Sequence, residues 1–168
     1  PAAASASIRA EGNQAWIRNN GVIRAYGVVL FGSIIASGPF GDAIVSKGNS
    51  ADIVNQGSIE GRLFSSGSGI NIINYGSMTG QLLVDPLNSD PIGVMLSEGD
   101  EAELLNFGLI SGRLTSTGDS FLLQNHGIID LGDVITYDTF GSIISDSGTI
   151  TSSGENAMIE NEGSIIGG

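Results

Sequence analysis

Cysteine is absent from this sequence of 168 residues, which excludes a disulfide framework and any thiolate metal site. Stability must therefore come from apolar burial and backbone hydrogen bonds. No run of 18 or more apolar residues occurs, so the segment contains no candidate for a membrane-inserted helix. Residues 1–7 are too short and uncharged to form a complete signal peptide, so an export signal would have been removed or would lie outside this sequence.

Basic residues are also scarce, and their distribution is uneven. Residues 1–84 carry five basic and four acidic side chains, whereas residues 85–168 carry one basic and 14 acidic side chains. Nucleic acids and anionic membrane surfaces select clustered Lys and Arg. The balance therefore argues against both as partners and leaves cations, basic surfaces and neutral glycans open.

Glycine is abundant, with 26 residues, and much of it belongs to an internal repeat. Six segments share the pattern Gly-polar-x-apolar-x-apolar-x-Asn-x-Gly-x-apolar. They begin at Gly12, Gly48, Gly67, Gly99, Gly118 and Gly154. Their starts are 36, 19, 32, 19 and 36 residues apart. We interpret these intervals as one turn of about 19 residues or two turns of about 18, with degenerate copies filling the longer intervals.

Apolar residues within each copy alternate with a period of two, which is the period of a β-strand. A unit of this length cannot close a core alone, but stacked copies can bury a continuous apolar column. The sequence therefore predicts an all-β fold, a single right-handed parallel β-helix (β-solenoid) of about nine rungs of 18–19 residues. The domain would span residues 1–168, with a degenerate first rung at 1–11 and an irregular or looped rung at 84–98, where Pro86 and Pro91 disfavour a central strand.

The asparagine of the repeat is its most specific position. Asparagine tolerates turn conformations, and its amide both donates and accepts hydrogen bonds, so stacked copies can bond from rung to rung. We predict a structural ladder, the alternative being a row of ligand-binding side chains. The ladder residues are Asn19, Asn55, Asn74, Asn106, Asn125 and Asn161.

The units VNQGSIEG, INYGSMTG, LNFGLISG and IENEGSIIG resemble the Asn-x-Gly-x-Ile-x-Gly repeats of bacterial autotransporter passengers and filamentous-haemagglutinin-like exoproteins. The resemblance covers about residues 8–168. It implies a right-handed β-helix that is secreted or displayed on the bacterial cell surface, where such rods commonly serve in adhesion or as stalks. The sequence shows neither a carboxy-terminal membrane barrel nor a clear cap, so it would be part of such a protein.

Acidic residues form two groups that suggest calcium, because hard cations take several oxygen ligands. The weak calcium candidates are Glu98, Asp100, Glu101, Glu103, Asp130, Asp133 and Asp138. The Gly-Gly-x-Gly-x-Asp motif of calcium-binding solenoids does not occur. The alternative is a solvated acidic face that keeps the rod soluble, and no other cofactor is expected.

The position between the ladder asparagine and the following glycine accepts many residue types, so we expect it at an exposed corner. Tyr75, Phe107 and His126 would lie there on one edge of the rod, as a binding strip for sugars or proteins or as ordinary surface aromatics. We expect no enzyme and no catalytic residues. After residue 84 only Arg113 is basic, and His126 is the single histidine.

The expected function is a structural or adhesive module of a secreted or cell-surface bacterial protein, working as a stalk, an adhesin or a self-assembling filament subunit. The alternative is a β-helical domain that binds or degrades carbohydrate. A glycan or a host or cell-surface protein would be the partner. Head-to-tail self-association is a further expectation, because the near-neutral first half and the acidic second half would lie at opposite ends of the rod.

Overall fold

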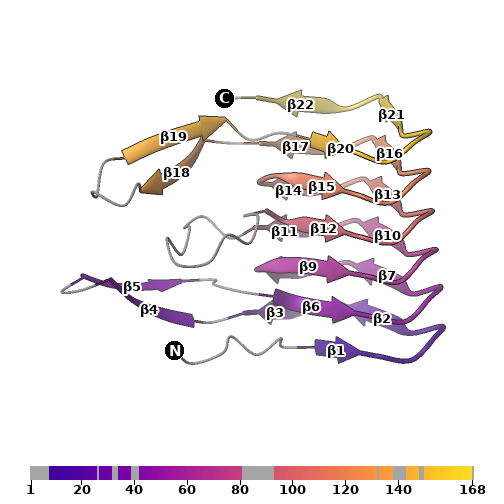
Figure 1. Ribbon diagram of the computed structural model, residues 1–168, viewed down its shortest axis with the longest axis horizontal. Coiled ribbons are helices and arrows are strands. Elements are labelled where there is room, and N and C mark those ends of the chain that lie inside the picture. Colours follow the sequence, from indigo (N-terminus) through magenta and orange to yellow (C-terminus); the bar gives the residue numbers. More distant parts are fainter. Residues whose placement is uncertain are drawn as a thin grey trace.

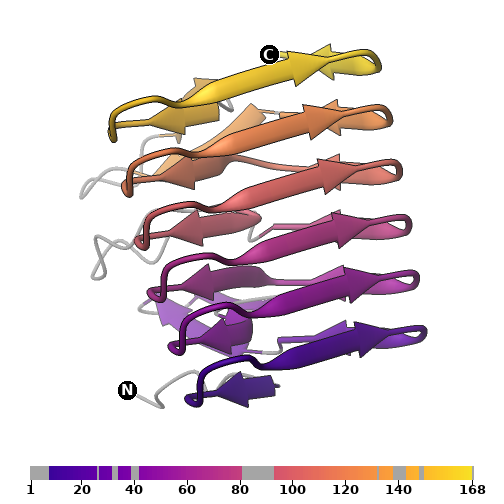
Figure 2. The ribbon, with the colours of Figure 1, turned by 90° about the vertical axis from the view of Figure 1, so that its right-hand side faces the viewer.

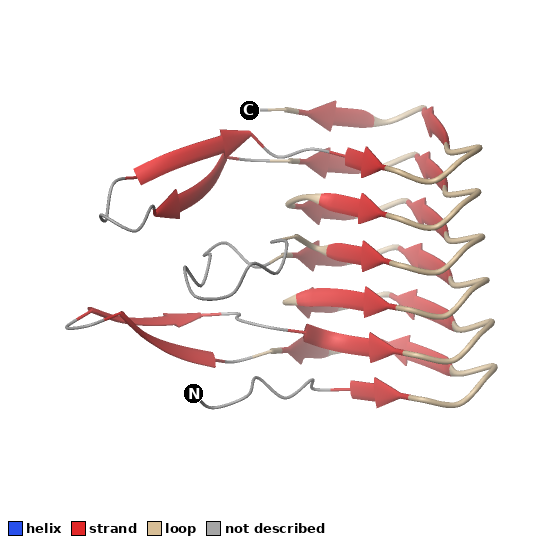
Figure 3. Cartoon of the chain, in the orientation of Figure 1, coloured by secondary structure: helices blue, strands red, loops and turns tan. Residues whose placement is uncertain are grey.

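Strands and connecting loops make up the described part of the chain, which comprises residues 8–25, 27–31, 34–38, 42–80, 93–131, 133–137, 143–147 and 150–167 of a computed structural model. No helix occurs in these ranges (Figure 3). Three six-stranded parallel sheets, called A, B and C here, stack around one core. The prediction of an all-β parallel β-helix is confirmed.

Each rung of the β-helix contributes one strand to each sheet. Sheet A contains β1 (Ile8–Ala10), β6 (Asp42–Ser46), β9 (Arg62–Ser65), β12 (Met95–Ser97), β15 (Leu114–Ser116) and β20 (Ile150–Ser152). Sheet B contains β2 (Trp16–Asn19), β7 (Asp52–Asn55), β10 (Asn71–Asn74), β13 (Glu103–Asn106), β16 (Leu122–Asn125) and β21 (Met158–Asn161). Sheet C contains β3 (Val22–Arg24), β8 (Ser58–Glu60), β11 (Ser77–Thr79), β14 (Leu109–Ser111), β17 (Ile128–Asp130) and β22 (Ser164–Ile166).

The structure corrects the number of rungs, because the described residues form six and not nine. Trp16 pairs directly with Asp52, so the first interval of 36 residues holds a single rung. The surplus residues include an antiparallel hairpin, β4 (Gly27–Phe31) with β5 (Ile34–Gly38). The last such interval holds β18 (Asp133–Tyr137) and β19 (Ile143–Ser147) in the same arrangement. An interval of 36 residues fits two turns as well as one turn with a hairpin, which is why degenerate turns were the wrong interpretation.

The two ranges predicted to be irregular are described only in part. Residues 1–7 of the first range and 84–92 of the second lie outside the described residues. Within the first range, Ile8–Ala10 form β1 and pair with β6 in sheet A. Within the second, Met95–Ser97 form β12, which pairs with β9 and β15 in the regular parallel register.

The handedness of the coil follows from the direction of the strands. In Figure 1 the chain rises from β1, the sheet A strands run left to right in front, and the sheet C strands return behind them. In Figure 2 sheet B faces the viewer. Its strands run from left to right, which is from the front to the back of Figure 1. The β-helix is therefore right-handed, as parallel crossovers almost always are.

Inward-facing side chains form continuous columns along the axis. Ile53, Ile72, Leu104 and Leu123 make one column in sheet B, and each is fully buried. In the neighbouring column, the large Phe121 follows the smaller Ala102 of the preceding rung, and both are 1% exposed. This packing is what a chain without disulfides needs, since each buried aliphatic side chain contributes about 1.5–3 kcal/mol.

The corner between sheets A and B, called corner AB, uses one residue in the left-handed region in every rung. These residues are Gln14, Ser50, Gly69, Glu101, Ser120 and Asn156, with φ between 56° and 68°. Each is the third residue of the repeat pattern. The left-handed conformation thus recurs at this position in every rung, although five of the six residues carry a side chain.

The corner between sheets C and A, called corner CA, has two forms. Rungs 2 and 4 pass it in one step through Gly61 and Gly112, whose φ values of 121° and 124° strongly favour glycine. After rungs 1, 3 and 5 additional residues separate sheet C from sheet A, of which residues 81–92 after rung 3 lie outside the described residues. In Figure 1 the β4–β5 and β18–β19 hairpins extend to the left of the stacked sheets from this corner.

Candidate functional site

The corner between sheets B and C, called corner BC, carries the asparagine ladder. Each buried asparagine donates from Nδ2 to Oδ1 of the asparagine in the next rung. The donor–acceptor distances are 2.8 Å from Asn19 to Asn55, 2.8 Å to Asn74, 2.8 Å to Asn106, 2.7 Å to Asn125 and 2.7 Å to Asn161. The five bonds form one unbroken chain of side-chain amides parallel to the axis, and burial strengthens the first four of them.

The same asparagines also close their own turns. Asn55 Oδ1 accepts a hydrogen bond from the Gly57 backbone at 3.3 Å, and its Nδ2 donates to the Ser77 carbonyl of the next rung at 3.0 Å. Each amide thus satisfies its own turn and links two rungs. Because the amide oxygen and nitrogen already form hydrogen bonds inside the rod, they have little capacity to bind a ligand.

The three residues predicted as a binding strip stack on successive rungs at corner BC. The ring centroids of Tyr75 and Phe107 are 5.1 Å apart with planes 6° from parallel, and those of Phe107 and His126 are 5.0 Å apart and 11° from parallel. His126 Nδ1 lies 3.0 Å from a Glu162 carboxylate oxygen. Because the ring faces cover one another, the strip presents mainly ring edges to solvent.

Aliphatic side chains extend this strip onto sheet C. Leu109 and Ile128 occupy equivalent positions of β14 and β17 and are 40% and 46% exposed. With Tyr75, Phe107 and His126 they form the corner patch, an apolar surface defined by these five residues. Ring edges and aliphatic groups suit an apolar protein surface better than the faces of sugar rings.

The acidic candidates lie on different sides of the rod. Glu98, Asp100 and Glu101 surround corner AB and Glu103 begins β13, whereas Asp130 lies across the core on sheet C. Asp133 begins β18, and Asp138 lies outside the described residues. No group of three or more His, Cys, Asp or Glu suited to a metal occurs among the residues that the structure describes. Calcium binding stays a prediction.

Two corner carboxylates have a structural use. Asp100 Oδ1 accepts the backbone N–H of Asp119 at 2.9 Å, and Asp119 Oδ1 accepts the N–H of Glu155 at 2.7 Å. Asn13 and Asn49 make the equivalent bonds in earlier rungs, at 3.0 and 3.1 Å. The polar residue after the first repeat glycine therefore joins rungs at corner AB, as the asparagine ladder does at corner BC.

A second buried polar column was missed from the sequence. Ser46, Ser65, Ser97 and Ser116 occupy one position of sheet A and are at most 1% exposed. Ser65 and Ser97 each donate to the carbonyl of the glycine two residues later, at 3.5 Å. The motif Ser-x-Gly, which ends each of these strands, was the available signal.

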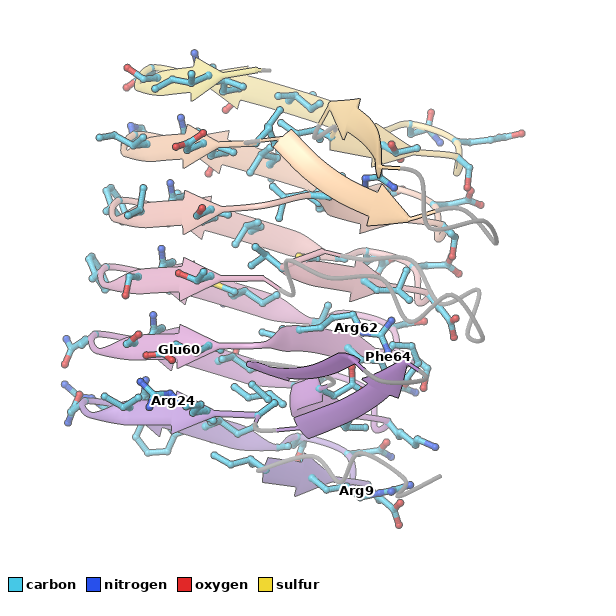
Figure 4. All side chains as sticks on the ribbon, turned by 90° about the vertical axis from the view of Figure 1, so that its left-hand side faces the viewer. Arg9, Arg24, Glu60, Arg62 and Phe64 are labelled. Atoms are coloured by element: carbon cyan, nitrogen blue, oxygen red, sulfur yellow. The ribbon has the colours of Figure 1, made fainter. Side chains whose placement is uncertain are left out.

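Ion pairs link rungs on the outer faces of sheets C and A. Arg24 and Glu60 lie side by side on β3 and β8 and pair through Nη2 and Oε1 at 2.7 Å (Figure 4). This hydrogen bond lowers the pKa of Glu60 below its ordinary value of 4.5, against an opposing effect of desolvation, and the charge of Arg24 adds a smaller lowering. Arg62 pairs with Asp42 at 2.6 Å and lies 5.7 Å from the Phe64 ring centroid.

Insertions in the coil share a single position. Ile59 and Leu63 flank a closed corner CA and are four residues apart, whereas their register equivalents Ile23 and Ile44 are 21 residues apart. Met78 and Met95 are 17 residues apart, and Ile129 and Ile150 are 21 apart. Insertions thus leave corner CA after rungs 1, 3 and 5, on every second rung.

Comparisons of the chain with models of known protein families, with curated proteins and with solved structures found no match. The described residues contain no helix long and apolar enough to cross a membrane.

Proposed function

We propose that the chain is a structural and adhesive module of a secreted or cell-surface bacterial protein, in which a rigid β-helical rod presents insertions along one edge. The observation that carries this proposal is the placement of all three insertions at corner CA of alternate rungs. At about 4.8 Å per rung, successive insertions leave the rod about 10 Å apart. Such spacing suits several simultaneous contacts with one extended partner.

Two further features support a rod that presents loops. Side-chain and backbone hydrogen bonds join neighbouring rungs at corners AB and BC, which stiffens the column that holds the insertions. Segments that leave a regular scaffold commonly carry binding functions. The resemblance to autotransporter passengers and haemagglutinin-like exoproteins points in the same direction, with a glycan or a host or cell-surface protein as the partner.

The test is to remove all three insertions without disturbing the coil, in a variant called the shaved chain. Residues 25–43, 80–94 and 131–149 are each replaced by Gly-Arg, the pair that closes corner CA in rungs 2 and 4. The intact and shaved chains are labelled and applied to an array of polysaccharides and extracellular-matrix proteins. We expect the shaved chain to keep its β-sheet circular dichroism and to lose the binding of the intact chain. Unchanged binding after shaving would contradict the proposal.

The same array separates the alternative function. A polysaccharide-degrading domain would shorten a polysaccharide on the array and release new reducing ends, which a display module does not. Release of reducing ends by the intact chain would therefore replace the proposal with the enzymatic alternative.

A further inference from the structure

The corner patch is a surface feature that the coil itself does not require. Rung 2 holds Gln56 and Ser58 at the positions that Phe107 and Leu109 occupy in rung 4. In both rungs these positions are flanked by a fully buried asparagine and a fully buried isoleucine. The coil therefore accepts polar side chains at the outward positions of corner BC, and the apolar side chains of rungs 3–5 call for another explanation.

Apolar side chains continue from the patch onto sheet B. Ile73 and Leu105 are half-buried, lie side by side on β10 and β13, and precede Tyr75 and Phe107 by two residues. Because outward residues of a strand are two apart, these side chains lead directly to the corner. The result is an apolar surface that runs from sheet B around corner BC to sheet C in the middle of the rod. A continuous surface of this kind marks an interaction site more often than single exposed residues do.

The aromatic side chains of the patch are held in place before any partner binds. The Phe107 ring stacks between the rings of Tyr75 and His126. Its backbone N–H donates to the Asn74 carbonyl at 2.8 Å, and the following Gly108 N–H donates to Asn106 Oδ1 at 3.2 Å. Little side-chain freedom would be lost on binding, which favours affinity.

The surroundings of the patch carry charge of one sign. Rungs 3–6 of sheets B and C and of corner BC contain no Lys or Arg, and their acidic residues are Glu103, Asp130, Glu160 and Glu162. Glu103 precedes Leu105 by two residues on the outer face of β13, and Glu162 lies beside His126. A complementary surface would place apolar side chains on the patch and cations at its margin.

The charge of the chain favours a different protein over a second copy. Each copy has a net charge of −12, and two corner patches placed face to face would bring their carboxylates together. The residues outside the described ranges contain no Lys or Arg either. The complementary charge is therefore best supplied by another polypeptide.

We propose that the corner patch docks a second protein through a segment in which aromatic or aliphatic side chains are flanked by Lys or Arg. The apolar side chains pack on Phe107, Leu109 and Ile128, and the cations pair with carboxylates at the margin, which orients the segment. In Figure 1 sheet C runs from corner BC on the right to corner CA on the left. The surface is thus separate from the insertions and independent of their proposed role.

The primary test lets the surface choose its ligand. A phage-displayed library of random dodecapeptides is selected on the intact chain, with prior removal of phage that bind the variant Phe107→Gln/Leu109→Ser. The enriched peptides should combine aromatic or aliphatic residues with Lys or Arg. Enrichment of acidic or uncharged peptides, or no enrichment at all, would overturn the proposal.

The same variant measures the apolar contribution. Phe107→Gln/Leu109→Ser gives rung 4 the corner BC sequence of rung 2, so its thermal unfolding midpoint should stay close to that of the intact chain. It should bind a synthetic enriched peptide at least about tenfold more weakly in fluorescence anisotropy. Gln56→Phe/Ser58→Leu, the reciprocal exchange, is the control and should bind at least as tightly as the intact chain. Equal binding by the rung 4 variant would contradict the proposed site.

A single neutralisation measures the charge contribution. Glu103→Gln should weaken peptide binding about threefold at low salt and less at high salt. Glu98→Gln removes the same charge near corner AB and should leave binding unchanged. Equal effects of the two substitutions would show that net charge, and not the margin of the patch, attracts the peptide.

Two further outcomes would assign the binding elsewhere. The shaved chain retains the corner patch and should bind the peptide as the intact chain does, whereas loss of binding would place the site on the insertions. Sedimentation velocity of the intact chain should show no dimer that Phe107→Gln/Leu109→Ser abolishes. Such a dimer would make a second copy the partner and overturn the proposal.

Discussion

Corners BC and CA solve the same geometrical problem, the reversal of the chain between two sheets, in opposite ways. At corner BC all six rungs keep Asn-x-Gly, and hydrogen-bonded side chains join each rung to the next. At corner CA two rungs turn on a single glycine, and three carry insertions. A side-chain ladder that runs through every rung therefore fixes the length of the first corner, whereas the second corner, where Arg62 pairs with Asp42 between two rungs, varies in length.

The largest effect should come from breaking the ladder at its centre. Asn106→Ala removes the acceptor of Asn74 and the donor to Asn125 and leaves buried amide groups without their partners. We expect the free energy of unfolding to fall by about 3 kcal/mol, measured by urea denaturation. Gln124→Ala, at an outward position of the next rung, is the control and should change it by about 0.5 kcal/mol or less. Equal losses of unfolding free energy from the two substitutions would contradict a stabilising role for the ladder.

The stability of the protein should be next most sensitive to substitution at a closed corner CA. Gly61→Ala places a side chain at φ 121°, which L-residues rarely adopt, and should cost about 1–3 kcal/mol by thermal unfolding. Ala25 occupies the equivalent position of an interrupted rung, where φ is not positive, and Ala25→Gly should cost less. A larger loss of stability for Ala25→Gly than for Gly61→Ala would contradict the requirement for glycine at φ 121°.

Corner AB permits a reciprocal pair of substitutions. Gly69→Ala should destabilise the protein by about 1 kcal/mol, because Gly69 has φ 68° and its Cβ would meet no atom closer than 3.8 Å, so that backbone strain is the whole effect. Ser120→Gly, at φ 59°, should be neutral or slightly stabilising. Both are read from urea denaturation midpoints, and a stabilising Gly69→Ala together with a destabilising Ser120→Gly would refute the strain argument.

The smallest effect should be the pH dependence of the Arg24–Glu60 pair. The pKa of Glu60 is lowered in the folded state, so its contribution is present above the unfolded value near 4.5 and is lost as the pH falls through the lower folded value. Glu60→Gln should therefore reduce the fall in thermal midpoint between neutral pH and about pH 3. An unchanged slope would show that other carboxylates account for it.

The sequence was sufficient to predict strands, parallel stacking and the identity of the inward columns, because period-two alternation and a recurrent Asn-x-Gly report directly on the coil. It was misleading for the number of rungs, since an interval of 36 residues fits two turns as well as one turn with a hairpin, here residues 27–31 and 34–38. The position of Tyr75, Phe107 and His126 on one edge followed from the repeat. The mutual stacking of their rings did not, because side-chain rotamers are not encoded in spacing.

The decisive measurement is the transplantation of one insertion to both corners of the same rung. Residues 25–43 are placed either in place of Gly61–Arg62 at corner CA or in place of Gln56 at corner BC, and thermal unfolding of both chains is followed by circular dichroism. We predict that the corner CA insertion costs about 1 kcal/mol, the scale of loop-closure entropy, whereas the corner BC insertion abolishes cooperative unfolding. Equal stability of the two chains would contradict the account.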